Sequence, residues 1–204
     1  MNTRQRVRIV YVGLLPLVVV GCGPQWQPLF DGKTLDGWRA VGNAVWTVED
    51  GAIVGRQDEQ HRPGDLVTEK QYGDFELDVT FKAVWPCNSG IWFRWANGKG
   101  YQLDILEWPD PVAYSGTLYC DGKMFLAKCE DKSLFRYNDW NRARIRAVGD
   151  HIVLTLNGRK TADVHDATWQ RGSIGFQVHP GDQFKDMKII VKDIRIRELT
   201  APAK

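Results

Sequence analysis

Alternation between apolar and polar side chains runs through most of this chain and predicts β-strands. In residues 75–82 every second residue is apolar, and the same period of two recurs in residues 142–147, 152–156 and 194–197. The apolar members of the first run are Phe75, Leu77, Val79 and Phe81. A period of two places one face of a strand in a core and the other face in water. No long stretch has the period of an amphipathic helix.

Turn signals separate these runs and indicate antiparallel hairpins. The pairs Asp50-Gly51, Asn97-Gly98 and Asn157-Gly158 stand between apolar segments. Both central residues of a type I′ turn need positive φ, which these residue types tolerate. About a dozen strands are expected, with a short helix or turn near residues 166–171. The fold class is therefore all-β, a two-sheet antiparallel β-sandwich or jelly roll formed by residues 30–199, followed by a tail at 200–204.

The first 21 residues have the composition of an export signal. Three arginines precede an apolar run over residues 9–21, which is shorter than the ~20 residues that a membrane-spanning helix needs. The run closes in Val-Val-Gly before Cys22, and small residues before a cysteine resemble a bacterial lipobox. We expect a lipoprotein signal peptide over 1–21, lipidation at Cys22 and a tether over 22–29. The alternatives are a signal anchor or an ordinary cleavage site. The expected location is the bacterial cell envelope, lipid-anchored to a membrane and facing the periplasm or the outside.

Removal of this leader changes the charge balance. The whole chain has 27 basic and 25 acidic side chains, for a formal charge of +2. The leader contains three arginines and no acid, so the remainder has 24 basic against 25 acidic side chains and a charge of −1. The case for a nucleic-acid partner therefore falls away. All nine tryptophans remain, and this composition favours the recognition of a carbohydrate.

Three cysteines remain after Cys22, and their spacing predicts no metal site. Export to an oxidising compartment favours a disulfide, for which Cys120 and Cys129 are the first choice and Cys87 is another possible partner. There is no C-x-x-C motif and no structural zinc spacing. Carboxylates could hold Ca²⁺, but no dedicated calcium loop is present. We therefore predict no cofactor.

Two strands joined by the Asn97-Gly98 hairpin carry the candidate site. If Ile91, Phe93, Trp95, Tyr101, Leu103 and Ile105 point inward, strand parity points Trp92, Arg94, Gln102 and Asp104 outward together. An aromatic plate beside an arginine, an amide and a carboxylate suits a sugar, because the ring stacks on C–H faces while the polar groups bind hydroxyls. The alternative is an ordinary cross-strand Arg–Asp pair on an exposed sheet face.

Other candidates for chemistry lie at strand ends. Glu107 precedes Trp108-Pro109, and His179 follows an apolar strand in the sequence Gln-Val-His-Pro-Gly. The arginines at positions 142, 144 and 146 indicate a solvated strand face. The sequence contains no G-x-S-x-G, no H-E-x-x-H and no glycine-rich phosphate loop, which argues against the enzyme classes that use those motifs.

The order of short motifs resembles the bacterial 3-keto-disaccharide hydrolase family, formerly a domain of unknown function. The matching segments are 28–38 (PLFDGKTLDGW), 46–51 (WTVEDG), 72–77 (YGDFEL), 88–94 (NSGIWFR), 100–106 (GYQLDIL), 116–119 (GTLY), 140–142 (WNR), 156–158 (LNG) and 175–179 (GFQVH). This resemblance implies a concanavalin A-like jelly roll, often an exported lipoprotein, that acts on 3-keto-glycosides. It places the site on the strands containing Asn88, Ser89 and Tyr101. The family usually has Glu and then Gln at the outward positions of the second strand, where this chain has Gln102 and Asp104.

The residues and the resemblance together predict an exported enzyme that cleaves a 3-keto-glycoside or disaccharide, as a hydrolase or by elimination and hydration. Asp104 is the expected acid or base, Arg94 the clamp for an oxyanion or hydroxyl, and Trp92 the stacking platform. The supporting residues are Gln102, Asn88, Ser89, Tyr101, Glu107 and His179. The alternatives are a non-catalytic carbohydrate-binding module at the cell surface and a purely structural envelope protein.

Overall fold

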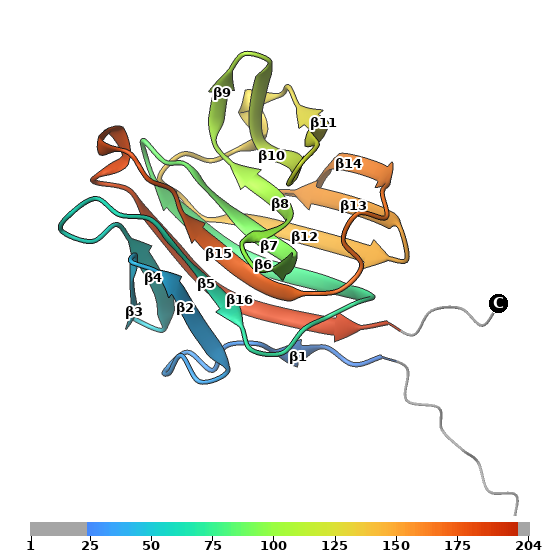
Figure 1. Cartoon of the computed structure of the whole chain (residues 1–204), viewed down its shortest axis with the longest axis horizontal. Coiled ribbons are helices and arrows are strands. Elements are labelled where there is room, and N and C mark those ends of the chain that lie inside the picture. Colours follow the sequence, from blue (N-terminus) through green and yellow to red (C-terminus); the bar gives the residue numbers. More distant parts are fainter. Residues whose placement is uncertain (1–23, 200–204) are drawn as a thin grey trace, which may run out of the picture.

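The computed structural model describes residues 24–199, and two antiparallel sheets of eight strands pack face to face within them (Figure 1). Helical structure in this part of the chain is confined to two 3₁₀ turns, η1 (Lys132–Leu134) and η2 (Asp182–Phe184). The predicted all-β sandwich is confirmed.

The first sheet has the strand order β14-β13-β12-β6-β16-β4-β3, and β1 pairs with β16 beside this path. Its strands are β1 (Gln27–Pro28), β3 (Val45–Glu49), β4 (Ala52–Arg56), β6 (Phe75–Val84), β12 (Asn141–Val148), β13 (His151–Leu156), β14 (Arg159–His165) and β16 (Lys188–Glu198).

The second sheet has the strand order β11-β10-β8-β7-β15-β5-β2, and β9 pairs with β10. Its strands are β2 (Trp38–Gly42), β5 (Gly64–Thr68), β7 (Ser89–Ala96), β8 (Lys99–Ile105), β9 (Glu107–Pro109), β10 (Val112–Cys120), β11 (Met124–Cys129) and β15 (Ser173–Val178).

The core lies between the sheets and is built from the residues with period two. The first sheet contributes Phe75, Leu77, Val79 and Phe81, all fully buried, and the second sheet contributes Ile91, Phe93, Leu103 and Ile105. Burying large apolar side chains from both inner faces is the main force that holds such a sandwich together.

The predicted hairpin turns are present. Asp50, Asn97 and Asn157 have φ of 49°, 51° and 48°, and the glycine after each also has positive φ. Left-handed backbone at both central positions is the geometry of a type I′ turn, which suits the twist of the flanking strands.

Several expectations need correction. Gln27 and Pro28, assigned to the tether, pair with Ile196 and Arg195 at the edge of the first sheet. Residues 166–171, expected to form a short helix or turn, are irregular, with bends at positions 168 and 171. The predicted signal peptide and Cys22 lie outside the described residues. Among residues 24–199, no helix is both long and apolar enough to cross a membrane.

The predicted Cys120–Cys129 disulfide is also wrong, because Cys87, Cys120 and Cys129 are all free and buried. The hairpin formed by β10 and β11 explains why Cys120 and Cys129 lie apart. Cys120 lies opposite Met124 next to the turn, whereas Cys129 lies opposite Tyr114 near the other end of the ladder.

Candidate functional site

The central strands of the second sheet bring polar side chains together on its outer face. Trp92 of β7 pairs with Gln102 of β8, and Gly90 pairs with Asp104. On the other side of β7, Gly90 pairs with Gln177 of β15. Strand parity therefore puts Trp92, Gln102, Asp104 and Gln177 on one face. The placement predicted for the first three is confirmed.

These side chains line a pocket of about 200 Å³. The lining residues are Asn88, Trp92, Gln102, Asp104, Leu106, Trp108, Tyr119, Met124, Phe125, Gln177 and His179. Aromatic rings form part of the wall, with Trp92 against Tyr119 and Trp108 against Phe125 in edge-to-face contacts. A pocket with aromatic walls and a few converging polar groups has the character of a small-molecule site.

Asp104 is the most unusual group in the pocket. Its side chain is only 2% exposed, and its Oδ2 atom has no hydrogen-bond partner. Burial raises the pKa of Asp104 well above its usual value. An unpaired carboxylate is expensive to bury, so burial shifts Asp104 towards the neutral carboxylic acid, which can donate a proton or a hydrogen bond.

A second carboxyl group, on a strand two places away from β7, holds Trp92. The indole Nε1 of Trp92 donates a hydrogen bond of 2.9 Å to Oδ1 of Asp65 on β5. Burial raises the pKa of Asp65 to about 6, against the opposing effect of this hydrogen bond. The contact fixes the orientation of the Trp92 ring.

His179 contributes a basic nitrogen at the edge of the pocket. Its Nδ1 lies 2.8 Å from the carbonyl oxygen of Pro180. A carbonyl can only accept, so Nδ1 is the donor and the neutral ring keeps a free lone pair on Nε2. The loop is held by Gln57, whose Nε2 donates to the carbonyls of His179 at 2.8 Å and Gly181 at 3.1 Å.

Arg94 does not lie on this face, and the prediction that it points outward with Trp92 is wrong. Arg94 has a φ of 51°, and the ladders that join β7 to β8 and to β15 both shift register beside it. Such a bulge adds one residue to the strand, so the side chains after it point to the opposite face from the one that alternation predicts. Trp95, predicted to be inward, consequently clusters with Trp92 and Val67 on the outer side.

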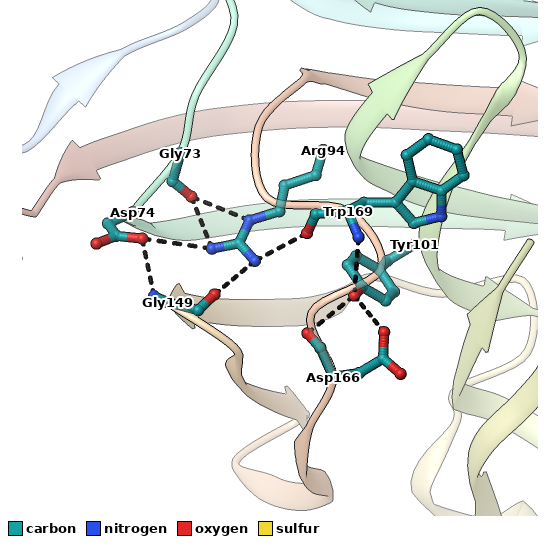
Figure 2. Close-up of polar contacts among 7 residues, drawn as sticks. All are labelled: Gly73, Asp74, Arg94, Tyr101, Gly149, Asp166 and Trp169. Atoms are coloured by element: carbon teal, nitrogen blue, oxygen red, sulfur yellow. Dashed lines mark hydrogen bonds and ion pairs between the residues drawn. The ribbon is translucent and has the colours of Figure 1, made fainter.

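The Arg94 guanidinium instead binds loop carbonyls, as Figure 2 shows. It is fully buried and donates to the carbonyl oxygens of Gly73, Gly149 and Trp169 at 2.8–3.1 Å. It also lies 3.4 Å from Asp74. These contacts join three loops, so the geometry of Arg94 is that of a structural residue rather than a substrate clamp.

The hydroxyl groups of Tyr101 and Ser89 are likewise engaged in hydrogen bonds within the protein. The Tyr101 hydroxyl donates to Asp166 Oδ1 at 2.6 Å and accepts from the Trp169 amide at 3.2 Å (Figure 2). The Ser89 hydroxyl donates to the carbonyl of Gln177. Neither side chain lines the pocket, so the structure does not support their predicted role in substrate binding.

Glu107 lies outside the pocket as well. It forms an ion pair with Lys132 at 2.9 Å and accepts a hydrogen bond from the Tyr137 hydroxyl at 2.7 Å. Of the residues predicted for the site, the structure brings together Trp92, Gln102, Asp104, Asn88 and His179. It does not include Arg94, Tyr101, Ser89 or Glu107 in this group.

Two polar residues of this face, Gln177 and Asp65, were not predicted from the sequence as members of the site. Gln177 stands between Phe176 and Val178, which are buried, so the alternation could have predicted that its side chain points outward. Its place beside Gly90 depends on β15 lying next to β7, which pairs segments far apart in the chain. Within residues 24–199, no group of three or more potential ligands is arranged to hold a metal ion.

Comparison with known proteins identifies the family. The family described as the 3-keto-alpha-glucoside-1,2-lyase-like domain matches residues 25–197, and the chain belongs to it. A 3-keto-disaccharide hydrolase of Bacteroides thetaiotaomicron is 36% identical over 168 residues, which covers 67% of this chain and 57% of that protein. The chain therefore spans little more than half the length of this relative. The resemblance seen in the motifs is confirmed.

Solved structures share the fold. A candidate glycosyl hydrolase of Parabacteroides distasonis superposes with a TM-score of 0.66 at 21% identity, covering 86% of this chain and 94% of that chain. A Bacillus subtilis protein with a galectin-like fold gives a TM-score of 0.63 at 15% identity, covering 87% and 96%. These likenesses confirm the concanavalin-like sandwich.

Proposed function

We propose that this protein is an enzyme that cleaves a 3-keto-glycoside in the pocket of the second sheet. The observation that carries the proposal is Asp104, a buried carboxyl group with an unpartnered oxygen in a pocket that also receives His179. A carboxyl group with a raised pKa and a nitrogen base in one pocket are the two kinds of group that acid–base catalysis needs. Family membership and the hydrolase relative support the assignment of an oxidised glycoside as the substrate.

The chemistry follows from the ketone at C3 of the sugar, which acidifies the hydrogen on C2. His179 Nε2 takes the C2 proton, and the freed electron pair forms a C1–C2 double bond as the bond from C1 to the leaving oxygen breaks. Asp104 gives its proton to that oxygen. Addition of water across the double bond then restores a 3-keto sugar, so that elimination and hydration together amount to hydrolysis. Direct hydrolysis would use the same acid and base.

The remaining pocket residues hold the substrate. The Gln102 amide nitrogen lies 3.1 Å from the Gln177 amide oxygen, so the two side chains form a joined pair that offers further donors and acceptors to hydroxyl groups. Trp92 offers its ring to the apolar face of the sugar. An adjoining hollow of about 330 Å³ shares Gln177 and His179 with the pocket and contains Asp65. It would receive the leaving group.

The test compares Asp104→Asn with Glu107→Gln on a 3-keto-disaccharide. Asparagine is nearly isosteric with a neutral carboxylic acid, so the fold should be retained while the proton donor is lost. Product release should fall by about a hundredfold or more in Asp104→Asn, the usual effect of losing a general acid. Glu107→Gln is the matched control outside the pocket and should keep the wild-type rate. Equal rates for Asp104→Asn and wild type would remove Asp104 from the mechanism.

The same assay addresses the alternative of a carbohydrate-binding module. Aromatic and amide groups on a sheet face are sufficient for binding without catalysis. Wild-type protein that binds the 3-keto-disaccharide without releasing product would support the module and contradict the enzyme.

We further propose that the protein is exported and anchored by a lipid on Cys22. The basic residues before the apolar run and the small residues before Cys22 support this location.

A further inference from the structure

The outer face of the first sheet carries an excess of positive charge. Arg142, Arg144 and Arg146 of β12 alternate there with the buried Ala143, Ile145 and Ala147. The neighbouring strands add Lys82, Lys188, Lys192, Arg195 and Arg197 on the same side. Against these eight basic side chains stand four acidic ones, Glu76, Asp78, Asp193 and Asp31, the last of which lines a hollow together with Arg142 and Arg195. These twelve side chains carry +4, whereas the chain after residue 21 carries −1.

The acidic residue with the most arginine partners, Asp78, is buried beneath the arginines that it binds. Asp78 alone accepts hydrogen bonds from Arg142 at 2.6 and 2.7 Å, from Arg144 at 3.1 Å and from Arg195 at 3.1 Å. Asp78 is 3% exposed, while the three arginines are 55%, 50% and 47% exposed. The negative charge of Asp78 is therefore below the surface, while the arginines that it binds stay in contact with solvent.

Two tryptophans lie among these cations. The Trp140 ring is 4.2 Å from the Lys192 ammonium and 5.4 Å from that of Lys82. The Trp26 ring is 5.0 Å from the guanidinium carbons of both Arg195 and Arg197. Tryptophan beside lysine and arginine is the composition that proteins place at the boundary between water and an anionic membrane.

The position of this face fits such a contact. It lies on the opposite side of the sandwich from the pocket, because the two sheets pack through their inner faces. The N-terminal strand β1 pairs with β16, the strand that carries Arg195 and Arg197 (Figure 1). A membrane against this face would leave the pocket open to soluble substrate.

We propose that the outer face of the first sheet binds the surface of a bilayer that contains anionic phospholipid. The attraction arises between phosphate headgroups and the basic side chains, with Trp26 and Trp140 at the level of the headgroups. It does not depend on the proposed activity or on lipidation of Cys22.

The test measures vesicle binding by protein that begins at residue 23, which retains every strand and the whole core. Binding to phosphatidylglycerol vesicles should be tighter than to phosphatidylcholine vesicles and should weaken with added salt. The double variant Lys188→Glu with Lys192→Glu should bind phosphatidylglycerol more than about tenfold more weakly. The matched control, Lys99→Glu with Lys128→Glu, makes the same change in net charge on strands β8 and β11 of the second sheet and should bind like wild type.

Three results would overturn the proposal. One is equal binding to the two kinds of vesicle. Another is an equal loss in the control, which would show that only net charge matters. The third is binding to an anionic polysaccharide or nucleic acid but not to vesicles, which would assign the face to another polymer. If the glutamate variant does not fold by circular dichroism, Lys188→Gln with Lys192→Gln provides the same comparison with a smaller loss.

Discussion

Gly90 faces Asp104 across the ladder that joins β7 and β8, and its missing side chain makes room for a neighbour. A Cβ atom at Gly90 would lie 2.2 Å from Cδ and 2.6 Å from Nε2 of Gln102. No side chain can occupy that position unless the Gln102 amide moves. The glycine therefore determines where one of the polar groups of the pocket can lie.

We predict that Gly90→Ala impairs the pocket more than the fold. The displaced Gln102 should raise the KM for a 3-keto-disaccharide by about tenfold, while overpacking lowers the free energy of unfolding by about 1–3 kcal/mol. Steady-state kinetics and urea denaturation measure the two effects. Gly73→Ala is the control, because its Cβ would meet nothing closer than 3.7 Å. An unchanged KM for Gly90→Ala would show that Gln102 does not contact the substrate.

Alternation of residue types was enough to place Trp92, Gln102 and Asp104, but not Arg94. Parity holds only along an uninterrupted ladder, and Arg94 is the residue at which the ladder shifts. It stands between two aromatic residues, Phe93 and Trp95, either of which is suited to a core. The pattern therefore contains no sign of the bulge, which depends on the loop carbonyls that receive the guanidinium.

At the scale of elements, the strands and hairpin turns could be predicted from local sequence and the order of the strands could not. Each type I′ turn depends on two adjacent residues, whereas β15 enters the sheet between β7 and β5, far from both in sequence. Gln177 and Asp65 reach the site only through that order. The disulfide prediction failed for a similar reason, because the cysteine spacing gave no information about the length of the β10–β11 ladder.

The strands β6, β12 and β16 are joined on their outer face by the cluster around Asp78. Burial raises the pKa of Asp78, but hydrogen bonds from Arg142, Arg144 and Arg195 outweigh it and lower the pKa from 3.8 to about 2. A carboxyl group with a depressed pKa in the folded state stabilises the fold above its unfolded pKa. That stability is lost as pH falls from 3.8 towards 2.

We predict that Asp78→Asn lowers the free energy of unfolding at pH 7 by about 1–2 kcal/mol, since solvent screens the half-exposed arginines. The difference between wild type and variant should shrink as pH falls through the same range. Urea denaturation at a series of pH values measures it. A difference that stays constant down to pH 2 would mean that the arginines do not depend on the charge of Asp78. Asp186→Asn, at an exposed aspartate outside this cluster, serves as the control.

At the scale of the whole molecule, the proposed active site and the proposed membrane contact lie on opposite faces of one sandwich. The pocket opens on the outer face of the second sheet, and the basic surface covers the outer face of the first. Because the core separates the two outer faces, substitutions at the lysines of the basic surface should leave the pocket intact. Orientation at a membrane and chemistry can therefore be altered separately.

At the N-terminus we predict a covalent lipid anchor on Cys22, in addition to the basic surface. The cysteine lies five residues before Gln27, the first residue of β1. When the full chain is expressed in a bacterium that is fed labelled palmitate, wild type should incorporate the label and Cys22→Ala should not. Gly23→Ala is the neighbouring control and should remain labelled. Mass spectrometry of the wild-type N-terminus should find an acylated Cys22 and no residue before it. Label that persists in Cys22→Ala, or an unmodified Cys22 in the wild type, would contradict the lipoprotein prediction and leave the basic surface as the proposed means of membrane contact.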